Sequence, residues 1–394
     1  MSVTLIAPQH KAGVIPQGNE GGRELDGVAV STQGKVWGLL GRKAGDNAQV
    51  LALADALGWP FEEKHILARS WELLPHLMLG PTLAGIDRSA SSPLDPPWPD
   101  LVISAGRRNE PVARWIARQS GGTARLVHLG RPWADPATYD LVVTTPQYFL
   151  PPAPNLLVLP LPLHRITAAR TTEAAKRLAP SLAHLPRPLT TVLIGGDSGP
   201  FVFTPEKGRR LAQGVNRLVA QSGGSALITD SPRTPEAVAE AFRATLDVPA
   251  VGYWWRARDP AGENPYVAFL GLADRFVVTG ESMSMMAEAA SLCRPLYLFD
   301  PGDPFGTWWR HGHNFRHKPL SHALAMRLAP MRMRRDVSRL QEALVQAGRA
   351  RWLHEAPALL TQGETWMERL CAAPEDGAHE AAQRIRALFG TARD

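Results

Sequence analysis

Most of the information on architecture lies in residues 275–285, which read Arg275-Phe276-Val277-Val278-Thr279-Gly280-Glu281-Ser282-Met283-Ser284-Met285. The apolar run predicts a short buried strand, and the glycine that follows predicts a turn. From residue 282 to residue 292 the apolar side chains recur at helical spacing. A buried strand, a turn of small residues and a helix form the repeating unit of a parallel α/β sheet.

The same unit recurs on both sides of this stretch. Further strands are predicted at residues 36–40, 101–103, 125–129, 140–144, 156–159, 191–194, 226–229, 248–253 and 295–299. Helices are predicted at residues 46–58, 110–120, 205–222 and 235–244. A proline-bearing connection at residues 146–162 separates two series of strands. We therefore predict an α/β fold with two Rossmann-like domains that face each other across a cleft.

Changes in composition along the chain predict four segments. Residues 1–34 are rich in glycine and polar side chains, which predicts a flexible leader. Residues 35–165 form the predicted N-terminal domain and residues 166–320 the predicted C-terminal domain. Residues 321–394 include basic amphipathic helices, which we expect to pack back across the domains.

Composition excludes several protein classes. The chain has 394 residues, of which 44% are hydrophobic and 20% are charged, so it is neither disordered nor fibrous. Its two cysteines, Cys293 and Cys371, show no metal or redox spacing, and no apolar run reaches membrane-spanning length. We expect a cytoplasmic protein, either fully soluble or peripheral at the inner membrane. The net charge of +6 favours anionic partners such as nucleotides, phosphosugars, lipid headgroups or nucleic acid.

Ligands of open α/β sheets bind beyond the carboxyl ends of the strands. In the first domain this rule predicts that two strand-end loops contact a ligand. They read Gly41-Arg42-Lys43-Ala44-Gly45-Asp46-Asn47 and Ser104-Ala105-Gly106-Arg107-Arg108-Asn109. The alternative is a pair of ordinary helix caps with solvated arginines. The predicted substrate-binding residues are Gly45, Asn47, Gln49, Ser104, Arg107 and Arg108.

The second domain offers two further strand-end loops. One reads Gly195-Gly196-Asp197-Ser198-Gly199, where relaxed backbone suits either a tight turn or a bound diphosphate. The other is the turn at Gly280, where small hydroxyl residues at a helix N-terminus would cradle a diphosphate. Glu288 lies one turn further, within reach of a sugar hydroxyl. The alternative is that Ser282 only caps the helix and Glu288 is solvated.

The turn at Gly280, the glutamate at position 288 and Arg294-Pro295 resemble GT-B glycosyltransferases of the peptidoglycan and lipid A pathways. A closer resemblance, over residues 36–300, is to the mitochondrial fission ELM family. It is carried by the motifs Gly45-Asp46-Asn47-Ala48-Gln49, Ser104-Ala105-Gly106-Arg107-Arg108, Gly195-Gly196-Asp197-Ser198-Gly199, Asn264-Pro265-Tyr266 and Thr279-Gly280-Glu281-Ser282-Met283-Ser284-Met285.

This resemblance implies a GT-B-like fold and two alternative functions. Plant members of the family recruit the fission machinery, which would make this chain a noncatalytic, membrane-associated or protein-recruiting scaffold. Bacterial relatives are often labelled nucleoside-diphosphate-sugar epimerases, but Tyr266 is not followed by the lysine of a Tyr-x-x-x-Lys motif. The GT-B-like fold instead implies a glycosyltransferase that uses a nucleoside diphosphate sugar as co-substrate and needs no other cofactor.

On the transferase hypothesis the C-terminal domain holds the donor and the N-terminal domain holds the acceptor. The expected donor-binding residues are Gly195, Gly196, Asp197, Ser198, Gly199, Asn264, Tyr266, Thr279, Gly280, Glu281, Ser282, Ser284, Met285 and Glu288. Asp46 and His128 are the candidate catalytic bases, because both stand at predicted strand ends. For His128 the alternative is a buried histidine that satisfies a backbone group.

The acceptor could be a lipid or a cell-envelope glycan. Residues 71–79 form a compact apolar segment with an interfacial tryptophan, which suits either a bilayer surface or a buried core helix. No nucleic-acid partner is expected, because the tryptophan pairs at residues 254–255 and 308–309 come with no recognised motif. No metal is expected either, since the cluster His311, His313 and His317 contains no acidic partner.

Overall fold

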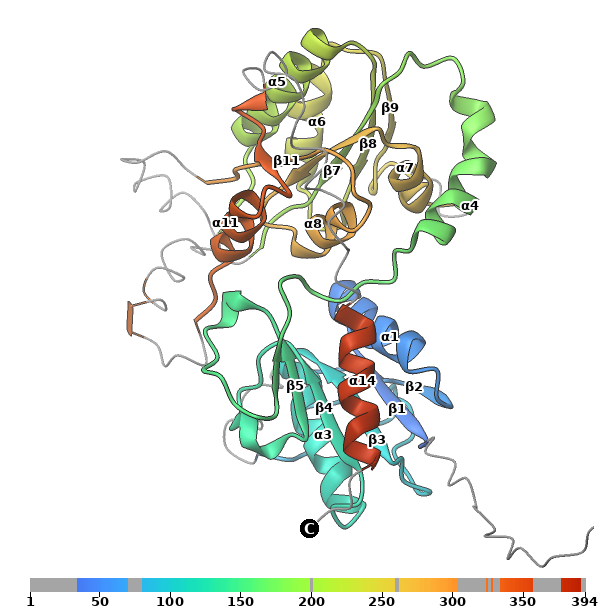
Figure 1. The fold of residues 1–394 in the computed structure, drawn as a ribbon, viewed down its shortest axis with the longest axis vertical. Helices are drawn as coiled ribbons and strands as arrows, with labels where there is room; N and C mark the ends of the chain where they lie inside the picture. Colours follow the sequence, from blue (N-terminus) through green and yellow to red (C-terminus); the bar gives the residue numbers. More distant parts are fainter. Residues whose placement is uncertain are drawn as a thin grey trace, which may run out of the picture. The chain divides into compact units, whose positions relative to one another are not determined.

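In the computed structural model the described residues are 34–69, 80–198, 201–258, 262–302, 324, 327–328, 334–356 and 377–390. They contain two parallel sheets of six strands each (Figure 1). The predicted α/β fold with two Rossmann-like sheets is therefore confirmed. Several predictions fall outside the described residues: most of the leader, the apolar segment 71–79, Gly199, the aromatic pair 308–309 and the three histidines between 311 and 317.

The first sheet has the strand order β2-β1-β3-β4-β5-β6. Its strands are β1 (Val36–Leu40), β2 (Phe61–His65), β3 (Leu101–Ala105), β4 (Arg125–Leu129), β5 (Leu141–Thr144) and β6 (Leu156–Val158). The helices of this half are α1 (Ala44–Leu57), α3 (Gly106–Gln119), η1 (Pro136–Thr138) and η2 (Pro146–Tyr148). Strands β1, β3 and β5 are buried along their whole length, as expected for a parallel sheet covered on both faces.

The second sheet has the strand order β12-β11-β10-β7-β8-β9. Its strands are β7 (Leu189–Ile194), β8 (Ser225–Asp230), β9 (Ala250–Tyr253), β10 (Arg275–Thr279), β11 (Leu296–Phe299) and β12 (Arg351–Trp352). Its helices are α4 (Ala168–Leu178), η3 (Ala179–Leu182), α5 (Pro205–Ser222), α6 (Glu236–Thr245), α7 (Tyr266–Leu272), α8 (Met283–Ala290) and α11 (Ser338–Gln346).

Each sheet has one point where the direction of strand addition reverses. In the first sheet β2 lies on one side of β1, and β3 to β6 extend on the other. In the second sheet β8 and β9 extend away from β7 on one side, while β10 to β12 extend on the other. The loops after β1 and β3 therefore diverge at one switch point, and the loops after β7 and β10 at the other. Ligands of such sheets bind at these points.

Among the described elements, strands β2 and β12 and helix α7 were not predicted. Strand β2 reads Phe-Glu-Glu-Lys-His and lies at a sheet edge with three exposed side chains, so it lacks an apolar run. Strand β12 has only two residues and pairs with β11. Helix α7 has seven residues, too few to establish helical periodicity in the sequence. All three depend on tertiary pairing or packing for their formation.

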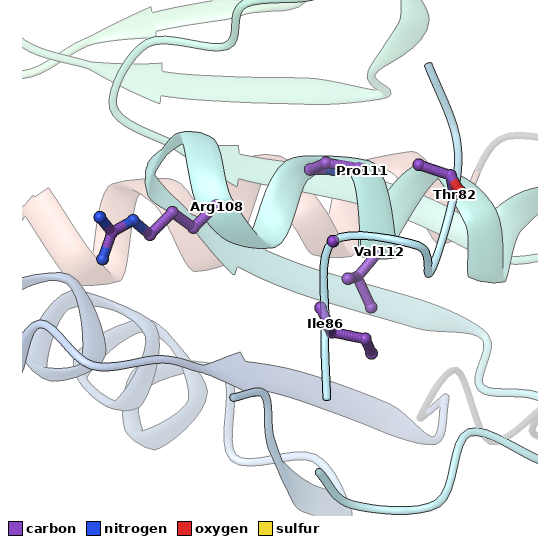
Figure 2. Close-up of a pocket in the computed structure, with 6 residues that line it drawn as sticks. Thr82, Ile86, Arg108, Pro111 and Val112 are labelled. Atoms are coloured by element: carbon purple, nitrogen blue, oxygen red, sulfur yellow. The ribbon is translucent and has the colours of Figure 1, made fainter. Parts of the chain in front are cut away.

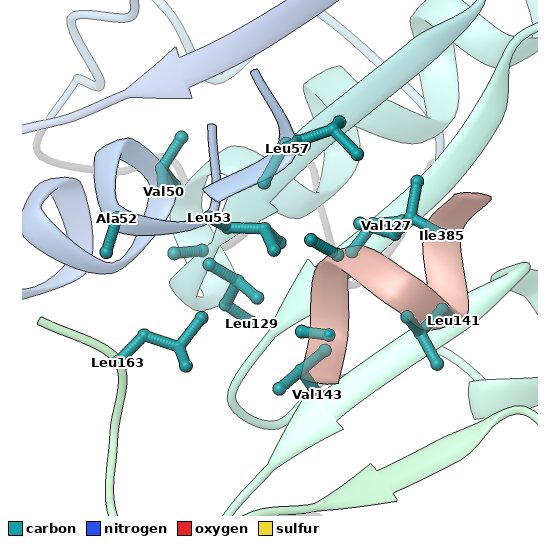
Figure 3. Packing of buried hydrophobic residues seen from close by; sticks show 14 of the residues in the cluster. Val50, Ala52, Leu53, Leu57, Val127, Leu129, Leu141, Val143, Leu163 and Ile385 are labelled. Atoms are coloured by element: carbon teal, nitrogen blue, oxygen red, sulfur yellow. The ribbon is translucent and has the colours of Figure 1, made fainter. Parts of the chain in front are cut away.

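The C-terminal helix α14 (Gly377–Gly390) packs on the first sheet, beside α1 (Figure 1). Its residues Ala381, Ala382 and Ile385 are completely buried. They belong to the hydrophobic cluster that includes Val127 and Leu141 of the sheet (Figure 3). The end of the chain thus completes the core of its first half. In the described part of the chain, no helix has the length and apolar character that crossing a membrane requires.

The packing of α14 predicts the effect of one substitution. Ile385→Ala removes methyl groups from a fully buried site, which should cost about 2–5 kcal/mol of stability. Thermal unfolding followed by circular dichroism measures this loss as a lower melting temperature. Gln383→Ala on the exposed side of the same helix is the control. Equal melting temperatures for the two variants would show that α14 does not pack as described.

Candidate functional site

The two predicted loops of the first sheet meet at its switch point. Residues from the loop after β1 and from the start of α3 line one small open pocket: Gly41, Arg42, Lys43, Asp46, Asn47, Ala105, Arg107, Arg108 and Asn109. The sequence placed both loops at strand ends, but the strand order is what brings them together.

The loop after β1 is held by its own side chains. Asn47 accepts a hydrogen bond from the backbone amide of Gly41 and donates one to its carbonyl oxygen, both at 2.8 Å. Gln49 donates to the carbonyl oxygen of Gly45 at 3.3 Å. Two of the predicted substrate-binding side chains therefore shape the loop, and the pocket is built on a braced backbone.

Asp46 is a residue of the first turn of α1, and its carboxylate lies close to the first residue of α3. Its side chain is 32% exposed, and one carboxylate oxygen is 3.8 Å from the ammonium nitrogen of Lys43. Gly106, the first residue of α3, has a φ of 68°, and a Cβ added there would stand 2.4 Å from the Asp46 carboxylate. Only glycine fits both the backbone conformation and this approach. Asp46 is thus an accessible carboxylate at the positive end of a helix.

The two arginines after β3 differ in their surroundings. The guanidinium carbon of Arg107 lies 5.1 Å from the ring centre of Trp133, a cation–π contact. Arg108 also borders a second small pocket, whose other walls include Ile86 and Val112. Figure 2 shows its guanidinium extending beyond the first turn of α3, away from these apolar side chains. Both arginines therefore contribute to the rim of the switch-point pocket.

His128 and Ser104 lie inside the sheet. Both are completely buried, and the Ser104 hydroxyl is 3.0 Å from Nδ1 of His128. The histidine ring also packs near Tyr139, with ring centres 5.3 Å apart. Because the ring is fully buried in this structure, a role of His128 as catalytic base stays a prediction that this geometry does not support. Ser104 likewise offers no side chain to a ligand.

Loops after β7 and β10 are joined by side-chain bonds at the switch point of the second sheet. The amide of Gly195 donates to Oγ1 of Thr279 at 2.8 Å, and the amide of Gly196 donates to Oε1 of Glu281 at 2.7 Å. Thr279 donates to the same Glu281 oxygen at 3.2 Å. The two glycine amides are therefore used within the fold.

Residues 195 and 196 must be glycines because neighbouring atoms occupy the space that a side chain would need. A Cβ on Gly195 would lie 1.8 Å from the Glu281 carboxylate, and one on Gly196 would lie 2.3 Å from the backbone of Arg233. Asp197 accepts the amide of Phe203 at 2.9 Å, and Ser198 pairs with Phe201 through two backbone hydrogen bonds of 3.0 Å. The predicted diphosphate loop is a tight, fully braced turn in its described part.

Sequence reasoning missed a third loop at this point, the one after β8. Thr234 donates a short hydrogen bond to the carbonyl oxygen of Gly195. Arg233 donates to the carbonyl oxygens of Gly196 and Asp197, at 3.4 and 3.2 Å. The strand-end rule, applied to this loop too, would have found both residues.

The N-terminus of α8 differs from the turns at Gly195 and Gly196. The amides of those turns donate to side chains, whereas no side chain of the preceding residue, Ser282, caps the first amides of α8. Ser282 is 4% exposed and, within the described part of the chain, its side chain makes no capping hydrogen bond. The first amides of a helix have no intrahelical acceptor, so those of Met283 and Ser284 are oriented to bind an anion. Gly45 of the first half lies against this turn, since a Cβ there would stand 3.0 Å from Oγ of Ser284.

Arg335 brings a positive charge to the same helix end. Its Nη2 lies 3.5 Å from the sulfur of Met283, and its Nε donates to Oε1 of Gln147 at 2.8 Å. Gln341 of α11 donates to the carbonyl oxygen of Gly280 at 2.7 Å and so fixes the turn from the other side. No sequence pattern placed either residue at this turn, because both stand more than fifty positions from the residues they contact.

Glu288 and Tyr266 form a pair. The Tyr266 hydroxyl donates a short hydrogen bond to the Glu288 carboxylate. Asn264 accepts the Tyr266 amide at 3.0 Å and so shapes the start of α7. Met285 packs on the apolar core of the second sheet. Glu288 is partly buried and paired, so it is not the solvated side chain of the alternative interpretation. Its contact with a sugar hydroxyl stays a prediction.

Two carboxyl groups near the second switch point have unusual pKa values. Burial raises the pKa of Glu281 to about 7, although the positive charge of Arg233 acts in the opposite direction. Burial also raises the pKa of Glu288 to about 7, opposed by the hydrogen bond from Tyr266. Oε2 of Glu281 is buried without a hydrogen-bond partner among the described residues, which fits a carboxyl that keeps its proton near neutral pH.

This predicts how stability depends on pH. The folded protein keeps the Glu281 proton between the ordinary value of 4.5 and about 7, where the unfolded chain has lost it. Stability therefore falls as pH rises through this window. Glu281→Gln cannot ionise, so relative to wild type it should gain about 1 to 3 kcal/mol between pH values of about 5 and 8.

Melting curves of both proteins across this pH range make the comparison. The amide retains an oxygen that can accept the Gly196 and Thr279 bonds, so the variant should fold. A constant difference in melting temperature across the range would contradict a raised Glu281 pKa.

Comparison with known proteins shows which family this chain belongs to. A family model described as mitochondrial fission ELM1 matches residues 44–389. The mitochondrial fission protein ELM1 of Arabidopsis thaliana is 28% identical over 237 residues, which cover 54% of this chain and 54% of that protein. The chain thus spans about half the length of this relative. An uncharacterised protein of Rickettsia prowazekii is 24% identical over 68% of this chain and 83% of its own length.

The solved structures to which this chain is similar are more distant in sequence. A UDP-GlcNAc 2-epimerase of Neisseria meningitidis, bound to UDP-GlcNAc, has a TM-score of 0.49 and 13% identity over 91% of this chain and all of that one. WaaG, a glycosyltransferase involved in lipopolysaccharide biosynthesis, has a TM-score of 0.40 and 12% identity over 91% of this chain and all of that one. Likenesses at this level identify neither a substrate nor a reaction. The family match does cover most of the chain, and this protein belongs to the mitochondrial fission ELM1 family.

Proposed function

We propose that this protein is a GT-B-type glycosyltransferase that uses a nucleoside diphosphate sugar as donor. The observation that carries the proposal is the second switch point, where an uncapped helix N-terminus, a braced turn and an arginine converge. Helix N-termini bind phosphate groups through their amides and their dipole. Arginine adds a planar fork that matches phosphate oxygens.

In this proposal the donor diphosphate binds at the start of α8, and Arg335 supports its negative charge as the leaving group departs. The turns at Gly195 and Gly196 do not bind the phosphates directly, because their amides already bond to Thr279 and Glu281. They form the rigid floor of the site. Rigid support matters because the donor must be held in a reactive orientation.

The acceptor binds at the first switch point, with Asp46 as the general base. Asp46 is the accessible carboxylate of that pocket, whereas His128 is fully buried. The contact between Gly45 and Ser284 supports this assignment, since it sets the residue before Asp46 against the proposed donor site. The base takes the proton of the acceptor hydroxyl, the acceptor oxygen bonds to the sugar carbon, and that carbon breaks its bond to the diphosphate, which leaves as the nucleoside diphosphate.

Donor binding is tested with the start of α8 altered. UDP, GDP, CMP, ADP and their common sugar conjugates should include one series that raises the melting temperature, as a ligand of the folded state must. At a concentration of about 100 times Kd the gain is about 2.7 kcal/mol. Ser284→Asp places a negative charge in the first turn of α8, which favours the helix but repels a diphosphate.

Ser284→Asn is the matched control, similar in size and uncharged. It should retain the nucleotide-induced shift that Ser284→Asp loses. If no nucleotide stabilises the wild-type protein, the donor site does not exist as proposed, and the noncatalytic scaffold is the better account.

Catalysis is tested at Asp46. With the donor identified by the melting experiment and a membrane lipid extract as acceptor source, Asp46→Asn should slow release of the nucleoside diphosphate by about 10²–10⁴-fold. Its melting shift with the donor should be unchanged. Asp55→Asn, an exposed carboxylate on the same helix, is the control and should react at the wild-type rate. Equal rates for both variants would remove Asp46 from the mechanism.

A further inference from the structure

We propose that the pocket at the first switch point binds a phosphate group carried by the acceptor. That this phosphate belongs to an acceptor rests on the proposed function, whereas phosphate binding by the pocket does not. Four of the nine residues that line it are cationic, namely Arg42, Lys43, Arg107 and Arg108. Asp46 is the single acidic member of this set. The side chains of the pocket therefore carry a formal excess of three positive charges.

Backbone dipoles add to this charge. Helices α1 and α3 both begin at the pocket, at Ala44 and Gly106. The residues that precede them, Lys43 and Ala105, carry no side-chain atom that could accept a hydrogen bond from the first amides of the helix. Each helix start presents amides and about half a positive charge. The Asp46 carboxylate stands in the first turn of α1 and close to the start of α3, so it partly offsets the positive charge of both helix starts.

The pocket is built on fixed backbone. Asn109 is 4% exposed and donates to the carbonyl oxygen of Leu39 at 2.9 Å, which ties α3 to the end of β1. Asn47 closes the loop after β1 through its two bonds to Gly41. A site whose amides are already in position loses little conformational entropy when an anion binds.

The size of the charge excess favours phosphate over carboxylate. A phosphate monoester carries about 1.5 to 2 negative charges at neutral pH and three acceptor oxygens. Such a ligand matches the three excess charges and three arginine forks better than a single carboxylate does. The phosphate could belong to a lipid headgroup or to a soluble phosphorylated molecule, and both sources share this chemistry.

Calorimetric titration of the full-length protein with inorganic phosphate tests the pocket directly. The double variant Arg107→Gln/Arg108→Gln should bind phosphate at least about tenfold more weakly than wild type. Arg118→Gln is the control: it removes one positive charge at the exposed far end of α3 and should bind within about twofold of wild type. Asp46→Asn removes the negative charge of the pocket, so it should bind phosphate more tightly.

Vesicle flotation distinguishes the two sources of phosphate. Wild-type protein is mixed with phosphatidylcholine vesicles that contain phosphatidic acid, and the same variants are compared. Flotation that is lost in the double variant and retained in Arg118→Gln assigns a lipid headgroup. Phosphate binding without flotation assigns a soluble phosphorylated acceptor.

Two results would overturn the proposal: no phosphate binding by the wild-type protein, or equal binding by wild type and the double variant. The donor test remains independent, because the start of α8 is unchanged in these variants. If the double variant keeps its nucleotide-induced melting shift, a failure of the phosphate proposal is separate from a failure of the proposed function. The same shift shows that the double variant is folded.

Discussion

The hydrogen bonds from the amides of Gly195 and Gly196 to Thr279 and Glu281 hold the second switch point together. They join two loops that leave neighbouring strands in opposite directions. Burial of the Glu281 carboxyl raises its pKa to about 7, while the hydrogen bonds that it accepts from Gly196 and Thr279 act in the opposite direction. A side chain on either glycine would collide with this arrangement. The floor of the proposed donor site therefore depends on two residues without side chains and one carboxyl that keeps its proton near neutrality.

The two switch points achieve rigidity in different ways. In the second sheet, side chains of one loop bind the backbone of another. In the first sheet, Asn47 binds the backbone of its own loop and Asn109 ties α3 to β1. The second site therefore has an acidic, buried floor, whereas the first is open and lined by cations. The proposed donor diphosphate is assigned to the second site because of the start of α8 and Arg335, and the proposed anionic acceptor to the first because of its cationic lining.

The chain completes each half with segments that come late in the sequence. Helix α14 fills the core of the first sheet, while α11 and β12 complete the second. Arg335 and Gln341, which contact the start of α8 and the turn before it, belong to this late stretch. The proposed donor site is thus assembled from residues on both sides of residue 300, so loss of the C-terminal stretch would affect the site as well as stability.

Local patterns in the sequence were sufficient for the buried strands, such as β3 and β10, because short apolar runs between glycine or proline turns are a local signal. They also placed the loops at Gly45, Arg107 and Gly280 at strand ends. The edge strand β2, the burial of His128 and the contact of Arg335 with α8 appeared only in the tertiary structure. Strand order brings distant residues together and determines which side chains water can reach. Neither property leaves a periodic trace along the chain, since both arise from pairings between residues far apart in sequence.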